Sequence, residues 1–387
     1  METAVLNRTS RILSGHLWVF SNELAGSPRR FAPGSLVELR DRRDNFLGIG
    51  YANPNSLISI RILTRQREEI DREFFKRRIS SALEYRMRFL RGADSFRAVF
   101  SEGDLLPGLI VDKYGDCLCV QFLTLGMEAR SEAALEALDE VFSPGVIVLR
   151  NDSPARTLEG LPLDKRVVKG SLERPPVIRD KGLLFGIDPL SGRKTGFFLD
   201  QAENRRAFAR LTGAGEALDL FCNTGAWALH MAKNGASVTG VDSSGTAVDA
   251  ARRNADMNGL AGGCVFLKAD VFDFVRGELP RGVLYDYMVL DPPAFVKSKA
   301  KINEALRAYR ELNTACLKLL KKGGLLATSS CSYHVDREAF MEVLRSSARD
   351  AGKPVRVVEM RSQAKDHPPL LSVPETEYLK CVILEAG

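Results

Sequence analysis

The regular alternation of short apolar runs with longer amphipathic stretches over residues 181–387 constrains the fold more than any other feature of the chain. Alternating strands and helices are typical of an α/β protein with a parallel, doubly wound, Rossmann-like sheet that carries helices on both faces. We expect strands at Ala217–Phe221, Ser237–Val241, Val265–Lys268, Tyr287–Leu290 and Leu325–Ser329, and helices at Gln201–Leu211, Ala226–Asn234, Gly245–Asn258, Ala300–Leu320 and Asp336–Arg349. Two further strands, Val355–Met360 and Tyr378–Leu384, have no long helix between them, so they are expected to end the sheet as an antiparallel pair.

The first 70 residues have a different pattern, with short apolar runs separated by glycine and Asn-Pro turn signals. Short strands with frequent turns predict a small β-barrel over residues 1–70. Its strands are expected at 35–40, 48–51 and 57–63.

Residues 71–180 are expected to form a linker helix and a small central α+β unit. Asp71 is placed to cap a helix that extends to Arg91. Strand-like runs then follow at 109–111, 117–122 and 146–149, with a helical stretch at 128–140 between the last two. Asp112 and Tyr114 are interpreted as turn residues of this unit, with a functional role as the alternative. The chain therefore divides into three expected domains, 1–70, 71–180 and 181–387.

Charge is distributed unevenly along the chain. Residues 1–91 carry 17 Lys and Arg against 10 Asp and Glu, whereas the remainder carries 38 against 39. A basic N-terminal segment on a neutral body indicates a polyanionic partner, most often a nucleic acid. A solvated basic face that binds nothing specific is the alternative.

Composition excludes several classes of protein. With 45% hydrophobic and 27% charged residues, the chain is not mainly disordered, collagenous or coiled coil. No apolar run approaches the ~20 residues that a membrane span needs, and no secretory pattern follows Met1. We therefore expect a cytoplasmic protein without a membrane partner. The seven cysteines form no Cys-x-x-Cys pair and there are only four histidines, which predicts reduced thiols and no metal site.

Ligands of open α/β sheets bind beyond the carboxyl ends of the strands. The first expected strand of the sheet contains Asp219 and turns through Phe221, Asn223, Thr224 and Gly225 into a helix. A dinucleotide pyrophosphate needs several glycines at such a turn, and Asp219 would repel phosphate. The carboxylate suits instead the cationic amino and sulfonium groups of S-adenosylmethionine. An ordinary strand-to-helix turn is the alternative.

Asp242 and Asp270 follow the next two expected strands. A carboxylate at the second strand end accepts hydrogen bonds from ribose hydroxyls, and Asp270 lies where an adenine amino group would fall. Asp242 with Ser243, and Asp270 with Val271, are therefore candidate nucleoside contacts. Asp242 alone does not separate a nicotinamide dinucleotide from S-adenosylmethionine.

The fourth expected strand is followed by Asp291, Pro292, Pro293, Ala294 and Phe295. Two prolines force an extended exit from a strand. The Asp291 carboxylate and the carbonyls of Pro292 and Pro293 are then directed outward as acceptors for the edge of a nucleobase, with Phe295 available for stacking. A rigid loop without a ligand is the alternative.

Cys331 follows the fifth expected strand and faces the same crevice. A thiol in this place is a candidate nucleophile, with a buried bystander as the alternative. C5 of cytosine attacks a methyl sulfonium only after a thiolate has added to C6, whereas methylation of an amino group needs no thiol. The neighbouring Asp291-Pro-Pro sequence favours the nucleophile. Because a base inside a helix must first be unstacked, a base-reading loop and an RNA-holding module are also expected.

Together these motifs resemble the RlmI-type (YccW-like) family of S-adenosylmethionine-dependent large-subunit ribosomal RNA cytosine-5 methyltransferases, over nearly the whole chain. The N-terminal barrel is similar to that family's RNA-binding PUA domain, and the middle of the chain to its EEHEE domain. The segments that carry the resemblance are Ser14–Phe20, Pro33–Val37, Lys194–Gln201, Asp219–Gly225, Asp291–Phe295, Ser330–Ser332, Asp366–Pro368 and Pro374–Tyr378.

The resemblance implies a role for Cys331 as the nucleophile and S-adenosylmethionine as the cofactor. Ala294 stands where a second cysteine usually assists product release, so Asp291 or water is the candidate for removal of the C5 proton. His367 is a candidate close to the target base, with stiffening of its loop as the alternative. The residues that would line the cofactor are Phe197, Phe198 and Gln201, with Asp219 at the methionine end, Asp242 at the ribose and Asp270 at the adenine.

The implied partner is large-subunit ribosomal RNA, and a homodimer stays open. Paralogues with similar architecture methylate guanine, so a guanine-directed enzyme is one alternative. A non-catalytic RNA-binding or ribosome assembly factor that keeps a cofactor pocket is another. The turn at Asn223–Gly225 disfavours a nicotinamide oxidoreductase.

Overall fold

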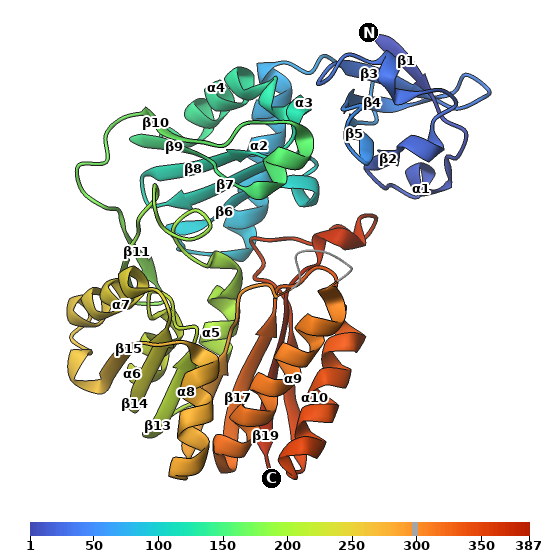
Figure 1. Ribbon diagram of the computed structural model, residues 1–387. Coiled ribbons are helices and arrows are strands. Elements are labelled where there is room, and N and C mark those ends of the chain that lie inside the picture. The colour runs from blue at the N-terminus through green and yellow to red at the C-terminus, as the bar shows by residue number, and fades with distance from the viewer. Residues whose placement is uncertain (296–300) are drawn as a thin grey trace. The chain divides into compact units, whose positions relative to one another are not determined.

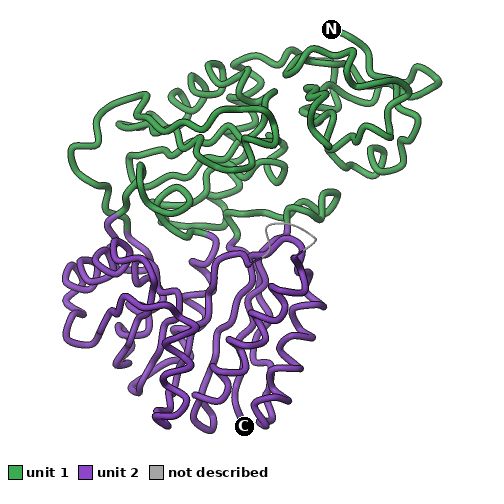
Figure 2. The backbone as a smooth tube through the Cα atoms, viewed as in Figure 1, with its two compact units in different colours: residues 1–178, 187–199, 365–376 green, residues 179–186, 200–364, 377–387 purple. Residues whose placement is uncertain are grey.

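The structure is a computed structural model that describes residues 1–295 and 301–387, so the expected helix start at Ala300 lies outside it. The chain forms two compact units, each built from several segments (Figure 2). Unit 1 comprises residues 1–178, 187–199 and 365–376. Unit 2 comprises residues 179–186, 200–364 and 377–387. The chain therefore passes five times from one unit to the other.

The described part of unit 2 contains a seven-stranded sheet with the order β15-β14-β13-β16-β17-β19-β18 (Figure 1). The strands are β13 (Gly215–Leu220), β14 (Ala236–Asp242), β15 (Cys264–Lys268), β16 (Tyr285–Leu290), β17 (Leu320–Ser330), β18 (Val355–Arg361) and β19 (Lys380–Ala386). β13 pairs in parallel with β14 and β16, while β19 runs antiparallel to both β17 and β18. The expected doubly wound fold and its antiparallel end are confirmed.

Helices separate the strands of this sheet. They are α5 (Ala202–Ala209), α6 (Ala226–Ala232), α7 (Gly245–Met257), α8 (Val271–Glu278), α9 (Ile302–Leu319) and α10 (Arg337–Ala351). Amphipathic patterning explains why they form: α9, for example, buries Tyr309, Leu312 and Cys316 against the sheet, at helical spacing. Helix α8 was not predicted, and neither was the small sheet of β11 (Val177–Asp180) and β12 (Leu183–Gly186).

The N-terminal sheet of unit 1 has the order β1-β3-β4-β5-β2. Its elements are β1 (Glu2–Val5), α1 (Ser10–Leu13), β2 (Trp18–Phe20), β3 (Leu36–Arg40), β4 (Phe46–Ala52) and β5 (Ile58–Thr64). Alternation makes β3 a strand, because Val37 and Leu39 enter the core while Glu38 stays partly exposed. Three strands were predicted here, and β1 and β2 were missed.

The second sheet of unit 1 has the order β10-β9-β8-β7-β6. Its elements are β6 (Ser95–Phe100), β7 (Leu109–Tyr114), β8 (Cys117–Phe122), α3 (Leu125–Glu128), α4 (Ser131–Phe142), β9 (Val146–Asn151) and β10 (Asp164–Lys169). Helix α2 (Arg72–Phe89) begins after Asp71, whose carboxylate accepts a hydrogen bond from the Phe74 N–H, so the predicted N-cap is confirmed. Phe74 and Phe75 of α2 pack in the core of this sheet.

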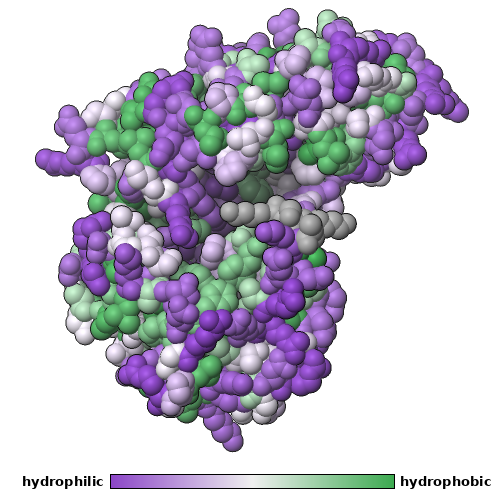
Figure 3. All heavy atoms as spheres, in the orientation of Figure 1, coloured by the Kyte–Doolittle hydropathy of each residue, from purple (hydrophilic) through white to green (hydrophobic). Residues whose placement is uncertain are grey.

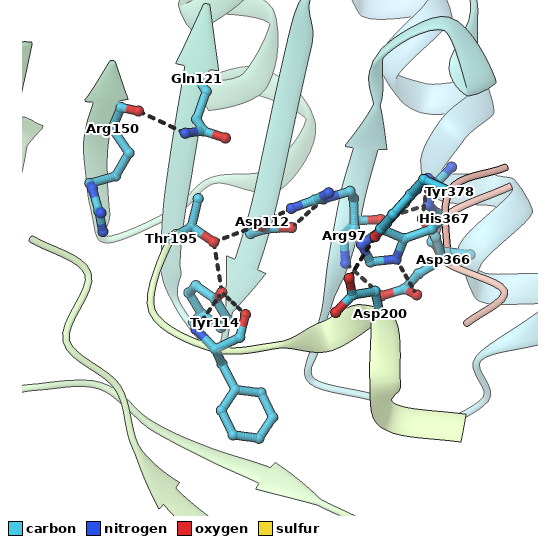
Figure 4. A network of polar contacts seen from close by, with 12 residues as sticks. Arg97, Asp112, Tyr114, Gln121, Arg150, Thr195, Asp200, Asp366, His367 and Tyr378 are labelled. Carbon is cyan, nitrogen blue, oxygen red and sulfur yellow. Dashed lines mark hydrogen bonds and ion pairs between the residues drawn. The ribbon is translucent and has the colours of Figure 1, made fainter. Parts of the chain in front are cut away.

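The interpretation of Asp112 and Tyr114 as turn residues is wrong. Both lie in β7 and both are completely buried. A carboxylate such as Asp112 is stable inside a buried strand only if other groups neutralise it or donate hydrogen bonds to it. Because such partners come from elsewhere in the chain, the local sequence around Asp112 did not reveal them. These partners are Arg97 and Thr195, and Figure 4 shows the three side chains pointing toward one another.

The visible outer faces of α9 and α10 are mostly hydrophilic (Figure 3). Ion pairs between exposed side chains of these two helices join Arg310 to Asp350 at 2.6 Å and Arg345 to Glu338 at 3.0 Å. A search of the described residues found no helix with the length and apolar character of a membrane span.

Candidate active site

The carboxyl ends of four neighbouring strands bring the candidate residues of unit 2 to one edge of the sheet. β14, β13, β16 and β17 are consecutive and parallel. Asp219 is the next-to-last residue of β13, and Asp242 is the last residue of β14. Asp291 directly follows β16, and Cys331 directly follows β17. Three carboxylates and a thiol thus share the edge at which ligands of such sheets bind.

The turn after β13 is conformationally unusual. Phe221 and Asn223 have left-handed backbone angles, with φ of 62° and 47°, and Gly225 has φ of 79° at the start of α6. A left-handed non-glycine residue costs roughly 1–3 kcal/mol and is typical of ligand-binding turns. The buried amide of Asn254 holds the turn by donating a hydrogen bond to the Thr224 carbonyl, 2.9 Å away. The turn is therefore a fixed element of the edge.

Asp219 is completely buried at the base of this turn. Its Oδ2 accepts a hydrogen bond from the Ala228 N–H at 3.0 Å, and its Oδ1 has no partner among the described residues. Burial, together with the nearby charges of Asp291 and Asp242, raises the pKa of Asp219 well above its usual range. A buried acceptor without a donor is costly, so this oxygen is suited to a cationic donor group of a ligand.

The Asp242 carboxylate joins two loops at the edge. Its Oδ2 accepts a hydrogen bond from the Asn223 N–H at 3.0 Å, and its Oδ1 accepts one from the Ser244 N–H at 2.9 Å. Each carboxylate oxygen has a second lone pair for a ligand hydroxyl. The neighbouring Ser243 is exposed.

Asp270 is exposed and caps α8, because its carboxylate accepts a hydrogen bond from the Asp273 N–H at 3.1 Å. Val271 is buried beneath it, as the first residue of that helix. Capping of α8 is therefore one reason for an aspartate at position 270. Its remaining lone pairs face solvent and stay available to a ligand.

Asp291 is held by two side-chain donors. The Gln201 amide donates to Oδ1 at 2.8 Å, and the Trp227 indole donates to Oδ2 at 3.1 Å. The same Gln201 amide also reaches the Ser329 hydroxyl at 3.1 Å. Gln201 is buried, so it binds β16 and β17 together at the edge rather than lying open to solvent.

The residues after Asp291 differ in exposure. Pro292 is buried and Pro293 is exposed. The half-buried ring of Phe295 lies 4.8 Å from that of Tyr309 and 6.3 Å from that of Phe221. Phe295 therefore already packs in an aromatic cluster, and only its exposed part remains for a ligand.

Cys331 is partly exposed, and its Sγ lies 3.9 Å from the Pro292 carbonyl oxygen. The thiol thus lies against the loop after β16. Burial raises the pKa of the Cys264 thiol to about 11 and that of the Cys381 thiol to about 12, and it raises the pKa of Cys222 and Cys316 far above the ordinary range. These four thiols are poor nucleophiles.

The remaining candidates belong to unit 1. Thr195 donates a hydrogen bond to Asp112 and lies 2.9 Å from the Tyr114 hydroxyl, which in turn accepts a hydrogen bond from the Phe197 N–H at 3.1 Å (Figure 4). Phe197 is buried. Phe198 is partly buried, with the Lys194 ammonium 4.5 Å from its ring centre. The Lys194–Phe198 segment is therefore anchored to β7.

His367 is buried in unit 1, with only 1% of its surface exposed. Its Nδ1–H donates to the Asp366 carboxylate at 2.8 Å, and its ring lies 5.2 Å from that of Phe100. Asp366 also accepts a hydrogen bond from the Arg97 N–H at 2.9 Å. These contacts tie the loop that carries His367 to β6.

Sequence reasoning missed two residues at the edge in unit 2. Trp227, in α6, has the apolar surroundings of an ordinary core residue, and only its indole N–H reaches Asp291. Lys380, at the start of β19, is buried, and its ammonium donates to the Ser332 carbonyl at 2.8 Å. Neither has a local sequence signal, because both partners are distant in the chain.

The residues at the edge fit S-adenosylmethionine. Oδ1 of Asp219, which lacks a partner in the part of the chain that the structure describes, matches an ammonium group, and Asp242 matches vicinal hydroxyls. No cluster of His, Cys, Asp and Glu suited to a metal ion occurs in residues 1–295 and 301–387.

Two family models match the chain. A PUA-like domain matches residues 7–65, and a methyltransferase domain matches residues 211–372. Solved structures with the same fold include a Streptococcus mutans protein described as a SAM-dependent methyltransferase, with a TM-score of 0.85 at 19% identity, covering both chains fully. Another, described as a methyltransferase complexed with SAH, has a TM-score of 0.87 at 18% identity, again over 100% of both chains.

Curated relatives are similar over nearly the full chain. A protein of Shewanella amazonensis is 38% identical over 95% of this chain and 94% of its own length. A protein of Aeromonas salmonicida is 36% identical over 99% and 98%, and one of Pseudoalteromonas atlantica is 35% identical over 97% and 96%. All three are named ribosomal RNA large subunit methyltransferase I.

Proposed function

The chain belongs to the ribosomal RNA large subunit methyltransferase I family, and on this premise we propose that it methylates C5 of a cytosine in large-subunit ribosomal RNA. The methyl donor is S-adenosylmethionine, and the reaction proceeds through a covalent adduct with Cys331. An RNA substrate of this kind favours the cytoplasm as the site of action.

The position of Cys331 carries this proposal. The thiol is partly exposed, follows β17 and lies 3.9 Å from the carbonyl oxygen of Pro292. A base whose edge is bound by the Asp291–Phe295 loop would therefore lie beside a sulfur atom. A guanine or an exocyclic amino group has no use for that thiol.

The chemistry of the thiol follows from the electronic structure of cytosine. The Cys331 thiolate forms a bond to C6, and the electron pair of the C5–C6 double bond makes C5 nucleophilic. C5 would then take the methyl group as the S–CH3 bond of the sulfonium breaks, with that electron pair left on the donor sulfur. Removal of the C5 proton returns its electron pair to the ring, restores the double bond and breaks the C6–S bond, which releases the thiolate.

S-adenosylmethionine supplies an electrophilic methyl group on a sulfonium. Asp219 would hold its ammonium end, Asp242 and Ser243 its ribose, and Asp270 and Val271 its adenine. The turn through Phe221, Asn223, Thr224 and Gly225 would support it, together with Gln201.

Asp291 is the group of this chain available for removal of the C5 proton, directly or through water. Gln201 and Trp227 fix its carboxylate, and the residue three positions later is Ala294, which has no thiol. Oriented acids and bases of this kind contribute typically 10²–10⁴-fold to a rate.

The PUA-like domain would hold the RNA. It contributes most of the excess positive charge of the first 91 residues and contains an open hollow of about 480 Å³. The hollow is lined by Arg8, Arg11, Phe20, Ser21, Asn22, Glu23 and Leu57. Two guanidinium groups beside an aromatic ring suit phosphate and base contacts.

Product analysis tests the proposal. Unmodified large-subunit ribosomal RNA is incubated with labelled S-adenosylmethionine and the purified chain, and the nucleosides are separated. We expect label in 5-methylcytidine. Label in a methylated guanosine, or none in any nucleoside despite tight RNA binding, would refute it.

An adduct trap tests the role of the thiol. In RNA that contains 5-fluorocytosine, fluorine replaces the C5 proton, so the final elimination cannot occur and the C6–S bond persists. We expect a stable protein–RNA band with the native chain and with Cys264→Ala, and none with Cys331→Ala. Cys264 is a matched control because it lies at the amino end of β15.

A further inference from the structure

A lysine with no assigned role is buried beside the candidate nucleophile. Lys380 is the first residue of β19, and only 5% of it is exposed. Its Nζ donates hydrogen bonds to the carbonyl oxygens of Ser332 and Tyr378, each at 2.8 Å. Its backbone is level with Ser330 of β17. Lys380 thus contacts the residues on both sides of Cys331.

Both hydrogen-bond partners of the ammonium are neutral. No carboxylate forms an ion pair with Lys380 in the part of the chain that the structure describes. Burying an ammonium that forms no direct ion pair is expensive, and buried lysines with a shifted pKa are a recurrent feature of functional sites. A structural anchor for two carbonyls could be built more cheaply from a neutral donor.

The charged groups that face Lys380 come from three elements. They are Cys331 after β17, Asp336 and Arg337 at the start of α10, and Glu377 before β19. Burial lowers the pKa of Lys380 to about 8, and negative charge on Cys331 opposes this lowering. Tyr309 of α9, whose hydroxyl lies 3.0 Å from that of Ser332, is a buried phenol whose pKa burial raises to about 12. Tyr309 therefore stays neutral, whereas Lys380 is a buried cation whose charge interacts with that of Cys331.

We propose that the buried ammonium of Lys380 holds Cys331 as a thiolate, which makes Lys380 a positioning residue for the nucleophile. The inference rests on the proposed function of Cys331. Charge interactions are reciprocal, so an anion that favours the ammonium is itself favoured by it. The thiolate is the reactive form of a cysteine, and Lys380 thereby supplies the reactive form before the base arrives.

The pH dependence of thiol alkylation tests the proposal. The full-length chain is treated with iodoacetamide across a range of pH, without RNA or cofactor, and modification of Cys331 is followed by peptide mass spectrometry. In Lys380→Gln, which keeps a donor for the carbonyls and loses the charge, we expect the half-maximal rate at a pH about one unit higher than in the native chain. Lys380→Arg keeps the charge and is expected to resemble the native chain.

An identical profile in folded Lys380→Gln and the native chain would overturn the proposal and leave Lys380 a structural anchor. If Lys380→Gln does not fold, the native profile decides alone. A half-maximal rate clearly below the ordinary thiol value of about 8.5 supports the proposal, and one at or above that value refutes it.

The readout is independent of the proposed function. Alkylation needs no methyl transfer, so a shifted profile stands even if the product is not 5-methylcytidine. Retention of 5-methylcytidine formation by Cys331→Ala would refute the proposed function whatever the alkylation profile shows.

Discussion

The indole N–H of Trp227 donates a hydrogen bond to Oδ2 of Asp291, 3.1 Å away. The other carboxylate oxygen accepts from the Gln201 amide at 2.8 Å. Two donors from different elements thus fix the carboxylate in one orientation. A carboxylate that only stabilised the loop after β16 would not need both donors. The arrangement therefore favours a carboxylate whose orientation matters for function.

Replacement of Asp291 by Asn tests this. The Asn amide presents N–H groups to at least one of the two donors, which breaks a hydrogen bond and removes the base. We expect methyl transfer to slow by about 10²-fold or more in single-turnover assays. The thermal melting temperature serves as the control for folding, and turnover near the native value would contradict the role of Asp291.

Replacement of Asp242 by Asn should weaken cofactor binding. A hydrogen bond to a charged group contributes about 1.5–3 kcal/mol, so the Kd for S-adenosylmethionine should rise roughly 10- to 100-fold in calorimetric titration. Asp249→Asn, at an exposed carboxylate on α7, is the matched control and should bind normally. Equal affinities of the two variants would remove Asp242 from the site.

Replacement of Thr195 by Val should destabilise unit 1. The change removes the hydroxyl that donates to the buried Asp112, and leaving a buried charged acceptor short of a donor costs about 1–3 kcal/mol. Although burial opposes it, Arg97 together with Thr195 holds the pKa of Asp112 below its usual range. Urea unfolding measures the loss, and the exposed Thr246→Val should show almost none.

Stability should depend on pH through Lys380. Its pKa is about 8 in the folded chain and about 10.5 when unfolded. Between these values the unfolded chain binds more protons, so stability rises with pH, and the penalty for the buried ammonium is complete below pH 8. The free energy of unfolding of the native chain, relative to Lys380→Met, should therefore rise by about 3 kcal/mol from neutral pH to about pH 10.

Urea unfolding of both chains at the two pH values gives this difference. Lys318→Met, at an exposed lysine of α9, provides the control, because its ammonium is not buried. A difference that stays constant with pH would show that Lys380 is not buried as described.

The fold of unit 2 could be predicted because its pattern is local. Each strand is a short apolar run, and each helix has its own periodic face, so neighbours in sequence carry the information. Helix α8 escaped because Asp270 was interpreted only as a ligand group, although an aspartate before an apolar run is also an N-cap. An aspartate in this place fits both a ligand contact and an N-cap, and the sequence does not show which of the two roles it has.

The missed parts of the site depend on long-range pairs. Lys380 meets Ser332 across 48 positions, Trp227 meets Asp291 across 64, and Thr195 meets Asp112 across 83. Such pairs have no periodicity and no fixed spacing. They become visible only when the sheets bring the partners together.

The two short segments that return to unit 1, residues 187–199 and 365–376, limit how this protein can recombine. The first brings Thr195 to Asp112, and the second brings Glu375 to within 3.2 Å of His16. A gene fusion that joined residues 1–178 to the catalytic half of another protein would leave Asp112 without Thr195 and His16 without Glu375. Exchange of modules between such enzymes must therefore carry three separate stretches of coding sequence at once, which favours inheritance of the two halves as a pair.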